Sequence, residues 1–249
     1  MNTNYFLISL LFCLFASSNL WSCDKDEDEK TDGTGSSVNL GRDLVLHYTF
    51  DEGFSTSSVQ TITDYSKSKI NGVLNGTPEF VTDTPKGSGY ALKLRRDDFI
   101  NIPSYAIKDS SNVSLSLWVK DFGQGLLFSS YNGTDRICPT LSISSSDELQ
   151  FQFGESANYS TAVFTSSIVG YQSGGWHMIT VTSASNLEKI CLFIDGILMD
   201  TQSGRNAKCS GTKMQIAYNA DPMLIDNVRV YARSLNVKEV SELYNQERK

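Results

Sequence analysis

Short runs in which apolar and polar residues alternate dominate the chain, and this is the period of a half-buried β-strand. Such runs occupy residues 44–51, 113–120, 126–128, 141–143, 149–153, 162–164, 176–182, 190–198 and 224–231. Gly, Asn, Asp and Ser clusters separate them, and Asp195-Gly196 between two apolar runs is a strong hairpin signal. The pattern predicts an all-β fold, a β-sandwich of two antiparallel sheets.

The last alternating run contains one residue that does not suit its position. Strict alternation places Leu224, Asp226, Val228 and Val230 on one face of the strand. Asp226 is therefore expected among core-facing aliphatic side chains. A carboxylate in that position is costly unless hydrogen bonds or a cation satisfy it.

A short C-terminal helix is predicted after this strand. Asn236 can cap its N-terminus, and Glu239 three residues later can complete a capping box. Leu235 and Val240 occupy the positions of a hydrophobic staple. We expect this helix to pack on the edge of the sandwich.

The first 38 residues differ from the rest. Residues 5–16 are almost wholly apolar but too few to span a bilayer easily, as in a signal peptide. Residues 24–37 are acidic and then rich in Gly, Ser and Thr, a composition typical of a solvated tether. The predicted organisation is a signal peptide over residues 1–22, a tether over 23–38 and one sandwich domain over 39–249.

Charge and cysteine content narrow the function further. The net charge is −7, and the tether with six acids and two bases supplies −4 of it. The domain lacks the basic stripe that a nucleic-acid partner requires. Cys138, Cys191 and Cys209 lie in the domain, where one disulfide with a free thiol and three free thiols are both open.

Motifs in both halves of the domain resemble laminin-G-like domains of the concanavalin A-like lectin/glucanase superfamily. They are Tyr48-Thr49-Phe50-Asp51-Glu52-Gly53, Gly89-Tyr90-Ala91-Leu92, Trp176-His177, Ile194-Asp195-Gly196 and Ile225-Asp226-Asn227-Val228-Arg229-Val230-Tyr231. The resemblance implies a jelly-roll sandwich in which the first and last strands are neighbours.

The end of the leader resembles a bacterial lipobox, with Ser22 before Cys23. The resemblance implies cleavage before Cys23 and lipid on its thiol. With the acidic run that follows, it is similar to surface lipoproteins of Bacteroidetes, anchored in the outer membrane and exposed on the cell. A periplasm-facing tether and an ordinary secretory signal are the alternatives.

Catalysis is disfavoured. Glycoside hydrolases occur in this superfamily, and laminarinase-type members carry acids two residues apart on one strand. From residue 39 onward no Asp or Glu has another acid at that spacing. Only two histidines are present, too few for a histidine-based metal centre.

Two binding sites are predicted. Trp118 shares a strand face with Ser114 and Ser116, and with Tyr131 these residues form the predicted carbohydrate-binding site. The alternative for Trp118 is packing against a neighbouring element.

Calcium is the second predicted ligand, because superfamily members often carry this ion at a sheet rim. Asp226, Asp51 and Asp64 are the candidate ligands, brought together if the first and last strands are neighbours. The alternative is that Asp226 accepts backbone hydrogen bonds and locks a turn.

The function predicted from these features is a non-enzymatic, lipid-anchored carbohydrate-binding module on the cell surface. Its partner is a glycan or polysaccharide, and its contact with the membrane is through the lipid alone. A structural or adhesive protein that contacts other surface proteins is the first alternative. A glycoside hydrolase is the weaker one.

Overall fold

The structure is a computed structural model that describes most of the predicted domain. The described residues are 38–52, 60–104, 107, 112–132, 135–153, 160–164, 168, 170–184, 188–204 and 211–248, without the side chains of 131, 132, 135–138, 153 and 160–163. The predicted signal peptide, Cys23 and almost all of the tether lie outside this part of the chain. Among the described residues, no helix is long and apolar enough to cross a membrane.

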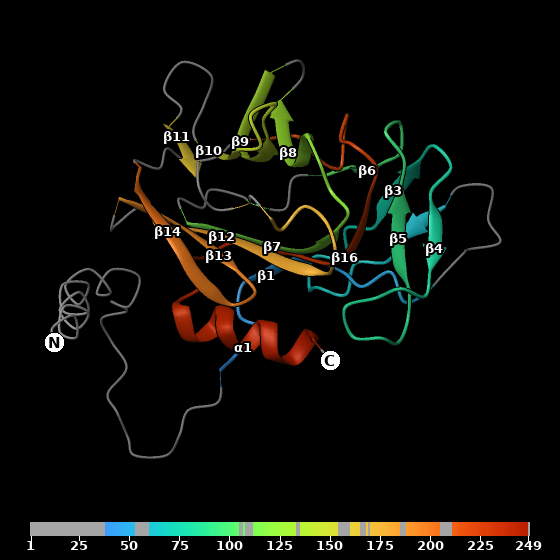
Figure 1. The fold of residues 1–249 in the computed structure, drawn as a ribbon, viewed down its shortest axis with the longest axis horizontal. Coiled ribbons are helices and arrows are strands. Elements are labelled where there is room, and N and C mark those ends of the chain that lie inside the picture. Colours follow the sequence, from blue (N-terminus) through green and yellow to red (C-terminus); the bar gives the residue numbers. More distant parts are fainter. Residues whose placement is uncertain are drawn as a thin grey trace, which may run out of the picture. The chain divides into compact units, whose positions relative to one another are not determined.

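Two antiparallel sheets of eight strands each form the domain (Figure 1). Sheet A has the order β14 (Ile197–Ser203), β13 (Lys189–Ile194), β12 (His177–Ala184), β7 (Val113–Lys120), β16 (Met223–Tyr231), β5 (Ala91–Leu94) and β4 (Glu79–Val81), and β1 (Leu44–Tyr48) also pairs with β16. Sheet B has the order β11 (Ser160–Phe164), β10 (Leu149–Phe153), β9 (Asp135–Ile143), β8 (Gly125–Asn132), β15 (Lys213–Ile216), β6 (Phe99–Ile102), β3 (Gly72–Asn75) and β2 (Thr61–Ile62). The predicted all-β sandwich is confirmed.

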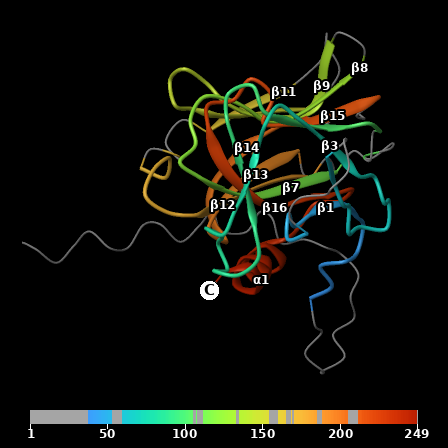
Figure 2. The same ribbon diagram turned by 90° about the vertical axis from the view of Figure 1, so that its right-hand side faces the viewer.

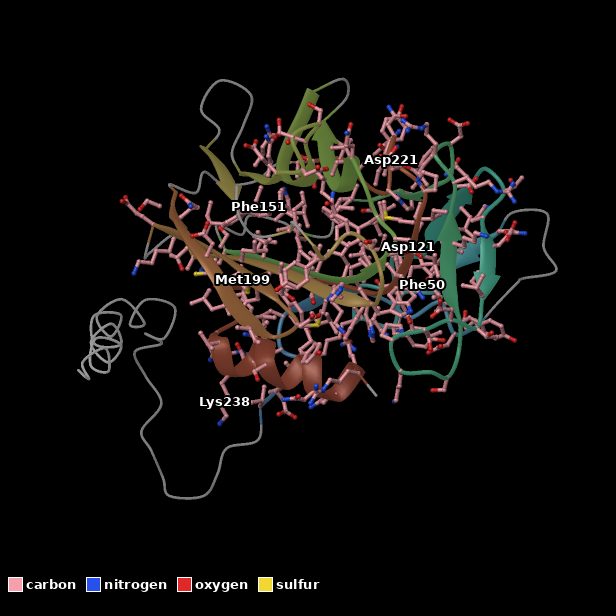
Figure 3. The ribbon with its side chains drawn as sticks, in the orientation of Figure 1. Phe50, Asp121, Phe151, Met199, Asp221 and Lys238 are labelled. Carbon is pink, nitrogen blue, oxygen red and sulfur yellow. The ribbon has the colours of Figure 1, made fainter. Side chains whose placement is uncertain are left out.

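Alternation along the strands builds the core between the sheets. Leu115, Leu117 and Val119 of β7 belong to one buried core cluster with residues of sheet B such as Phe151. Side chains from both sheets fill the space between them (Figure 3). Burial of these apolar surfaces is the main source of stability for a sandwich of this kind.

The ends of the domain meet in sheet A, as the resemblance implied. β1 pairs antiparallel with β16, with Tyr48 opposite Val228. The expected strict alternation of β16 is wrong, however, because the register with β7 shifts between Asp226 and Arg229. Asn227 lies in this β-bulge and has a φ of 44°. Because of the bulge, the alternation between core-facing and outward-facing residues along β16 is shifted by one position after it.

The bulge moves Asp226 away from the core. Ile225 before it and Val228 after it both join the core cluster. Asp226 lies opposite Trp118 of β7 in the register, so it shares the outer face of sheet A with that residue. The expectation that Asp226 is a core-facing residue is therefore corrected.

The predicted helix is present as α1 (Val237–Glu247), and its capping box is confirmed. The backbone N–H of Glu239 donates to Asn236 Oδ1 at 2.9 Å, and that of Asn236 donates to Glu239 Oε2 at 3.0 Å. Figure 2 shows sheet A between sheet B and α1. The helix therefore covers the outer face of sheet A.

Candidate functional site

Trp118, the main residue of the predicted sugar site, lies beneath α1. Its side chain is 2 % exposed, and its Nε1–H donates to Glu247 Oε2 at 2.8 Å. Its ring stacks on that of Tyr244 at 5.4 Å. The expectation of an exposed aromatic platform is wrong, because α1 occupies the face on which a sugar would have to stack.

The predicted neighbours of Trp118 are structural as well. Ser114 Oγ donates to the carbonyl of Arg233 and accepts the N–H of Leu235, both at 2.9 Å, so it fixes the chain entering α1. Ser116 bonds to Thr180 Oγ1 at 2.8 Å within the sheet. Tyr131 belongs to β8 in the other sheet, and its side chain lies outside the described residues.

Asp64, one of the predicted calcium ligands, is a turn lock. It is fully buried, and its two carboxylate oxygens accept four hydrogen bonds. The donors are the N–H groups of His47, Ser66 and Ile70 and the hydroxyl of Ser66, at 2.8 to 2.9 Å. Accepting backbone hydrogen bonds that hold a turn was the alternative role predicted for Asp226. In the structure Asp64 has this role.

Asp226 is 3 % exposed and accepts the N–H of Asn227 at 2.7 Å. Burial, and then the negative charges of Asp51 and Glu247, raise the pKa of its carboxyl to about 8. Asp51 itself accepts the N–H of Tyr90 at 3.1 Å.

No group of three or more His, Cys, Asp or Glu side chains among the described residues could hold a metal ion. Asp51, Asp64 and Asp226 are all described, so they do not converge on one cation site.

A second segment closes more of the outer face of sheet A. Asp83, in the connection after β4, accepts a hydrogen bond from Trp176 Nε1 at 2.9 Å. The other oxygen of the same carboxylate pairs with Lys120 Nζ at 2.6 Å. With α1 beside this connection, little of the outer face of sheet A is left for a large ligand.

Sheet B has an outer face that no described helix or strand covers. Every described strand belongs to one of the two sheets, and α1 lies on sheet A. The residues that alternate with the core residues of sheet B project from this face. They are Gln150, Gln152, Thr140, Ser142, Ser129, Gln215 and Asn101, and we call them the sheet B row.

The register brings members of the sheet B row together. Gln152 lies opposite Thr140, Gln215 lies opposite both Ser129 and Asn101, and Val73 extends the row to Thr61 on β2. All seven row residues are uncharged amides or hydroxyls. The four amides and Ser142 are half-buried, whereas Ser129 and Thr140 are only 2 % exposed. The four amides can both donate and accept hydrogen bonds on this face.

An aromatic pair adjoins this row. Phe99 shares the outer face of β6 with Asn101, and its ring meets that of Tyr218 edge-on at 5.2 Å. Sequence reasoning missed the row and the pair. The signal that could have found them is the recurrence of Asn and Gln at the polar positions of three strands.

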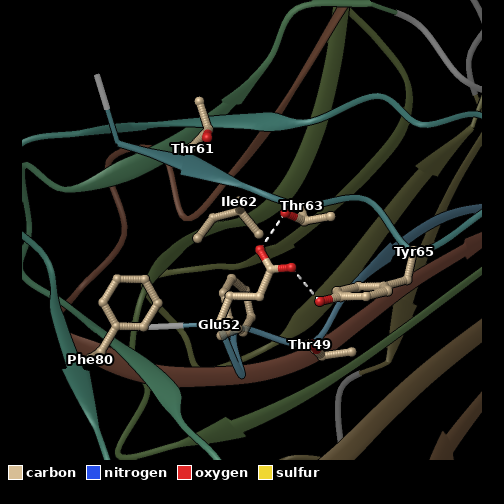
Figure 4. A pocket seen from close by; sticks show the side chains of 8 residues that line it. Thr49, Glu52, Thr61, Ile62, Thr63, Tyr65 and Phe80 are labelled. Atoms are coloured by element: carbon tan, nitrogen blue, oxygen red, sulfur yellow. Dashed lines mark hydrogen bonds between the residues drawn. The ribbon is translucent and has the colours of Figure 1, made fainter. Parts of the chain in front are cut away.

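A small pocket lies at one rim, lined by Thr49, Phe50, Glu52, Thr61, Ile62, Thr63, Tyr65 and Phe80 (Figure 4). It lies beside two edge strands, β2 of sheet B and β4 of sheet A. Glu52 is its charged residue, and Tyr65 OH donates to Glu52 Oε1 at 2.5 Å. Asp51 and Asp64 are next to pocket-lining residues in the sequence. The sequence motifs that contain these two aspartates therefore lie close to the pocket.

Solved structures support the fold. Domain 4 of AbnA, an extracellular arabinanase from Geobacillus stearothermophilus in complex with arabinotriose, matches with a TM-score of 0.62 and 18% identity, over 81% of this chain and 98% of that one. The binding domain of botulinum neurotoxin DC in complex with SialylT gives 0.62 and 13%, over 84% and 52%. The binding domain of Paraclostridial Mosquitocidal Protein 1 gives 0.61 and 18%, over 84% and 53%.

The chain thus spans about half the length of these toxin binding domains. No curated protein matches the sequence. A family model described as the concanavalin A-like lectin/glucanases superfamily matches residues 94–241, which is more than half of the chain. With the two-sheet sandwich, this match shows that the protein belongs to the concanavalin A-like lectin/glucanases superfamily.

Proposed function

We propose that the protein is a non-enzymatic carbohydrate-binding module whose ligand lies on the outer face of sheet B. The observation that carries this proposal is the sheet B row, a set of uncharged amides and hydroxyls that the register aligns on β8, β15 and β6 and, separately, on β9 and β10. The arabinotriose complex of the similar arabinanase domain is in keeping with it.

The spacing of the row suits an oligosaccharide. Neighbouring strands lie about 4.8 Å apart, roughly the length of one monosaccharide. A chain laid across β15 and β6 therefore meets one amide on each strand, Gln215 and then Asn101. Side-chain amides such as Gln215 and Asn101 both donate and accept, as sugar hydroxyls do. The Phe99–Tyr218 pair adds apolar surface beside them.

The non-enzymatic part of the proposal rests on the surroundings of the acids. A glycosidase needs a protonated carboxyl and an ionised carboxylate on either side of the scissile bond. Asp226 has the raised pKa of such an acid, with Asp51 near it. At 3 % exposure, however, Asp226 has no access to a glycosidic oxygen. Hydrolysis of any polysaccharide by the purified protein would contradict this.

A glycan array followed by calorimetry with the glycans that bind tests the proposal. The double variant Asn101→Ala/Gln215→Ala removes two amides from the row, each worth about 1 kcal/mol. Affinity is expected to fall at least about tenfold with the fold intact. Gln246→Ala, at an exposed position of α1, is the matched control and should bind like the wild type.

Two outcomes would defeat the proposal. One is a glycan bound equally well by the double variant. The other is binding of no glycan while a surface protein co-purifies, which would favour the adhesive alternative.

We further propose that the module is anchored to the outer membrane by lipid on Cys23 and exposed on the cell surface. The support is the sequence Ser22-Cys23 followed by an acidic tether. Stable anchoring takes more than one acyl chain, as a lipoprotein N-terminus provides.

A further inference from the structure

The rim pocket carries negative charge without a cation beside it. Asp51 and Glu52 are both exposed, and neither forms an ion pair with any described residue. From the described residues, Asp51 accepts one backbone hydrogen bond and Glu52 accepts hydrogen bonds from two hydroxyls. The charge of the pair is therefore left to solvent or to a ligand.

Glu52 is held in a fixed orientation. The hydroxyls of Thr63 and Tyr65 each donate to one of its oxygens (Figure 4). These hydrogen bonds hold the pKa of Glu52 below its ordinary value, so the carboxylate stays ionised at neutral pH. Each oxygen keeps lone pairs for a further donor.

Two exposed tyrosines are hydrogen-bonded to the two carboxylates. Tyr65 is 46 % exposed and Tyr90 40 % exposed, which places both among the most exposed large side chains of the described residues. Tyr65 is bonded to Glu52, and the backbone of Tyr90 is bonded to Asp51. The exposed ring of Tyr65 beside the Glu52 carboxylate can attract an organic cation through the ring and the charge together.

Two other ligand chemistries fit the rim pocket less well. A calcium ion needs six to eight oxygens, and the nearby carboxylate of Asp64 already accepts four hydrogen bonds. A neutral sugar could bond to Glu52 but would leave the charge of both acids uncompensated. An ammonium group matches the charge and the lone pairs.

The pocket lies where the sheet B row ends. Thr61 of β2 continues the row through Val73, and it is also one of the residues that line the pocket. A glycan laid along the row therefore reaches the rim at β2. We propose that the rim pocket recognises the ammonium group of an unacetylated amino sugar in that glycan. This inference rests on the proposed carbohydrate-binding function.

The experiment compares two oligosaccharides of one length and linkage, one of glucosamine and one of N-acetylglucosamine. Calorimetry should show the glucosamine oligomer bound about tenfold more tightly, the combined effect of a surface ion pair and a cation–π contact. In Glu52→Gln this preference should vanish, while the N-acetylated oligomer binds as before. Glu242→Gln on α1 is the matched control and should keep the preference.

The outcomes separate the two proposals. Equal binding of both oligomers by the wild type overturns the cationic subsite and leaves carbohydrate binding in place. A preference that persists in Glu52→Gln also overturns it, since the charge is then recognised elsewhere. Binding of neither these nor any other glycan removes the carbohydrate function and the subsite with it. Unchanged thermal unfolding of Glu52→Gln excludes misfolding as the cause of a loss.

Discussion

Asp64 and Asp226 are both buried aspartates, yet their surroundings give them opposite properties. Four donors surround Asp64, which compensates for the loss of water. Asp226 accepts a single backbone hydrogen bond from the described part of the chain and lies near two other acids. Burial and like charge therefore keep Asp226 protonated, so that it destabilises the fold at high pH.

Asp226→Asn should make the protein more stable at alkaline pH. The folded carboxyl keeps its proton up to about pH 8, whereas the unfolded one loses it near about pH 4. Unfolding therefore releases a proton between these values, and the free energy of unfolding of the wild type falls as pH rises, by at most about 1.4 kcal/mol per unit. Asparagine has no such loss, and its Oδ1 can still accept the N–H of Asn227.

Urea denaturation at about pH 5 and about pH 8 measures this difference. The gain of the Asn variant over the wild type should grow between the two values. Asp97→Asn, at an exposed aspartate, is the control and should show no growing gain. An Asn variant that loses stability equally at both values would mean that the Asp226 carboxyl is ionised in the folded protein.

At the scale of elements, α1 is fastened to sheet A by polar groups as well as by its apolar stripe. Leu243 and Val240 are buried, and Tyr244 stacks on Trp118. Glu247, at the last turn, accepts hydrogen bonds from Trp118 Nε1 and from Arg229 Nε at 2.6 Å. A carboxylate that is 6 % exposed is thus compensated by an indole and a guanidinium.

Glu247→Ala should lower the free energy of unfolding by about 3 kcal/mol, because it leaves the guanidinium of Arg229 without its partner beneath α1. Denaturant unfolding measures the loss, and tryptophan emission should shift to the red as Trp118 gains solvent. Glu242→Ala on the same helix should change stability by less than about 0.5 kcal/mol. Equal effects of the two variants would show that the buried pair does not fasten α1.

At the scale of the molecule, the two faces of the sandwich differ. α1 and the connection carrying Asp83 close the outer face of sheet A, whereas the sheet B row has no described element over it. This asymmetry is what assigns the proposed ligand to sheet B.

Cys23→Ser tests the anchor. If lipid on this thiol holds the protein, the variant should move from the membrane fraction to the soluble fraction when cells are fractionated. Protease treatment of intact cells that produce the wild type distinguishes surface exposure from the periplasm-facing alternative. Retention of the Cys23→Ser variant in the membrane would mean that another segment or partner holds the protein there.

Local signals were enough for much of the fold. Period-two alternation located most strands, and the spacing of Asn236 and Glu239 predicted the capping box, because both depend on residues a few positions apart. The resemblance of the first and last motifs predicted that β1 and β16 are neighbours. The candidate site is predicted less well. The alternation offers Trp118 as a sugar platform with packing as the alternative, and it packs beneath α1, while no local pattern singles out the sheet B row.

The sequence by itself determined an all-β sandwich with a capped C-terminal helix. The reason is that the hydrophobic period of a strand and the capping of a helix both depend on residues close together in the sequence. Only the tertiary structure decided which face the C-terminal helix covers. The bulge at Asn227 turned Asp226 away from the core, and the docking of α1 buried Trp118. Register then aligned amides from strands far apart in the chain. These outcomes depend on contacts between distant segments, which no local pattern encodes.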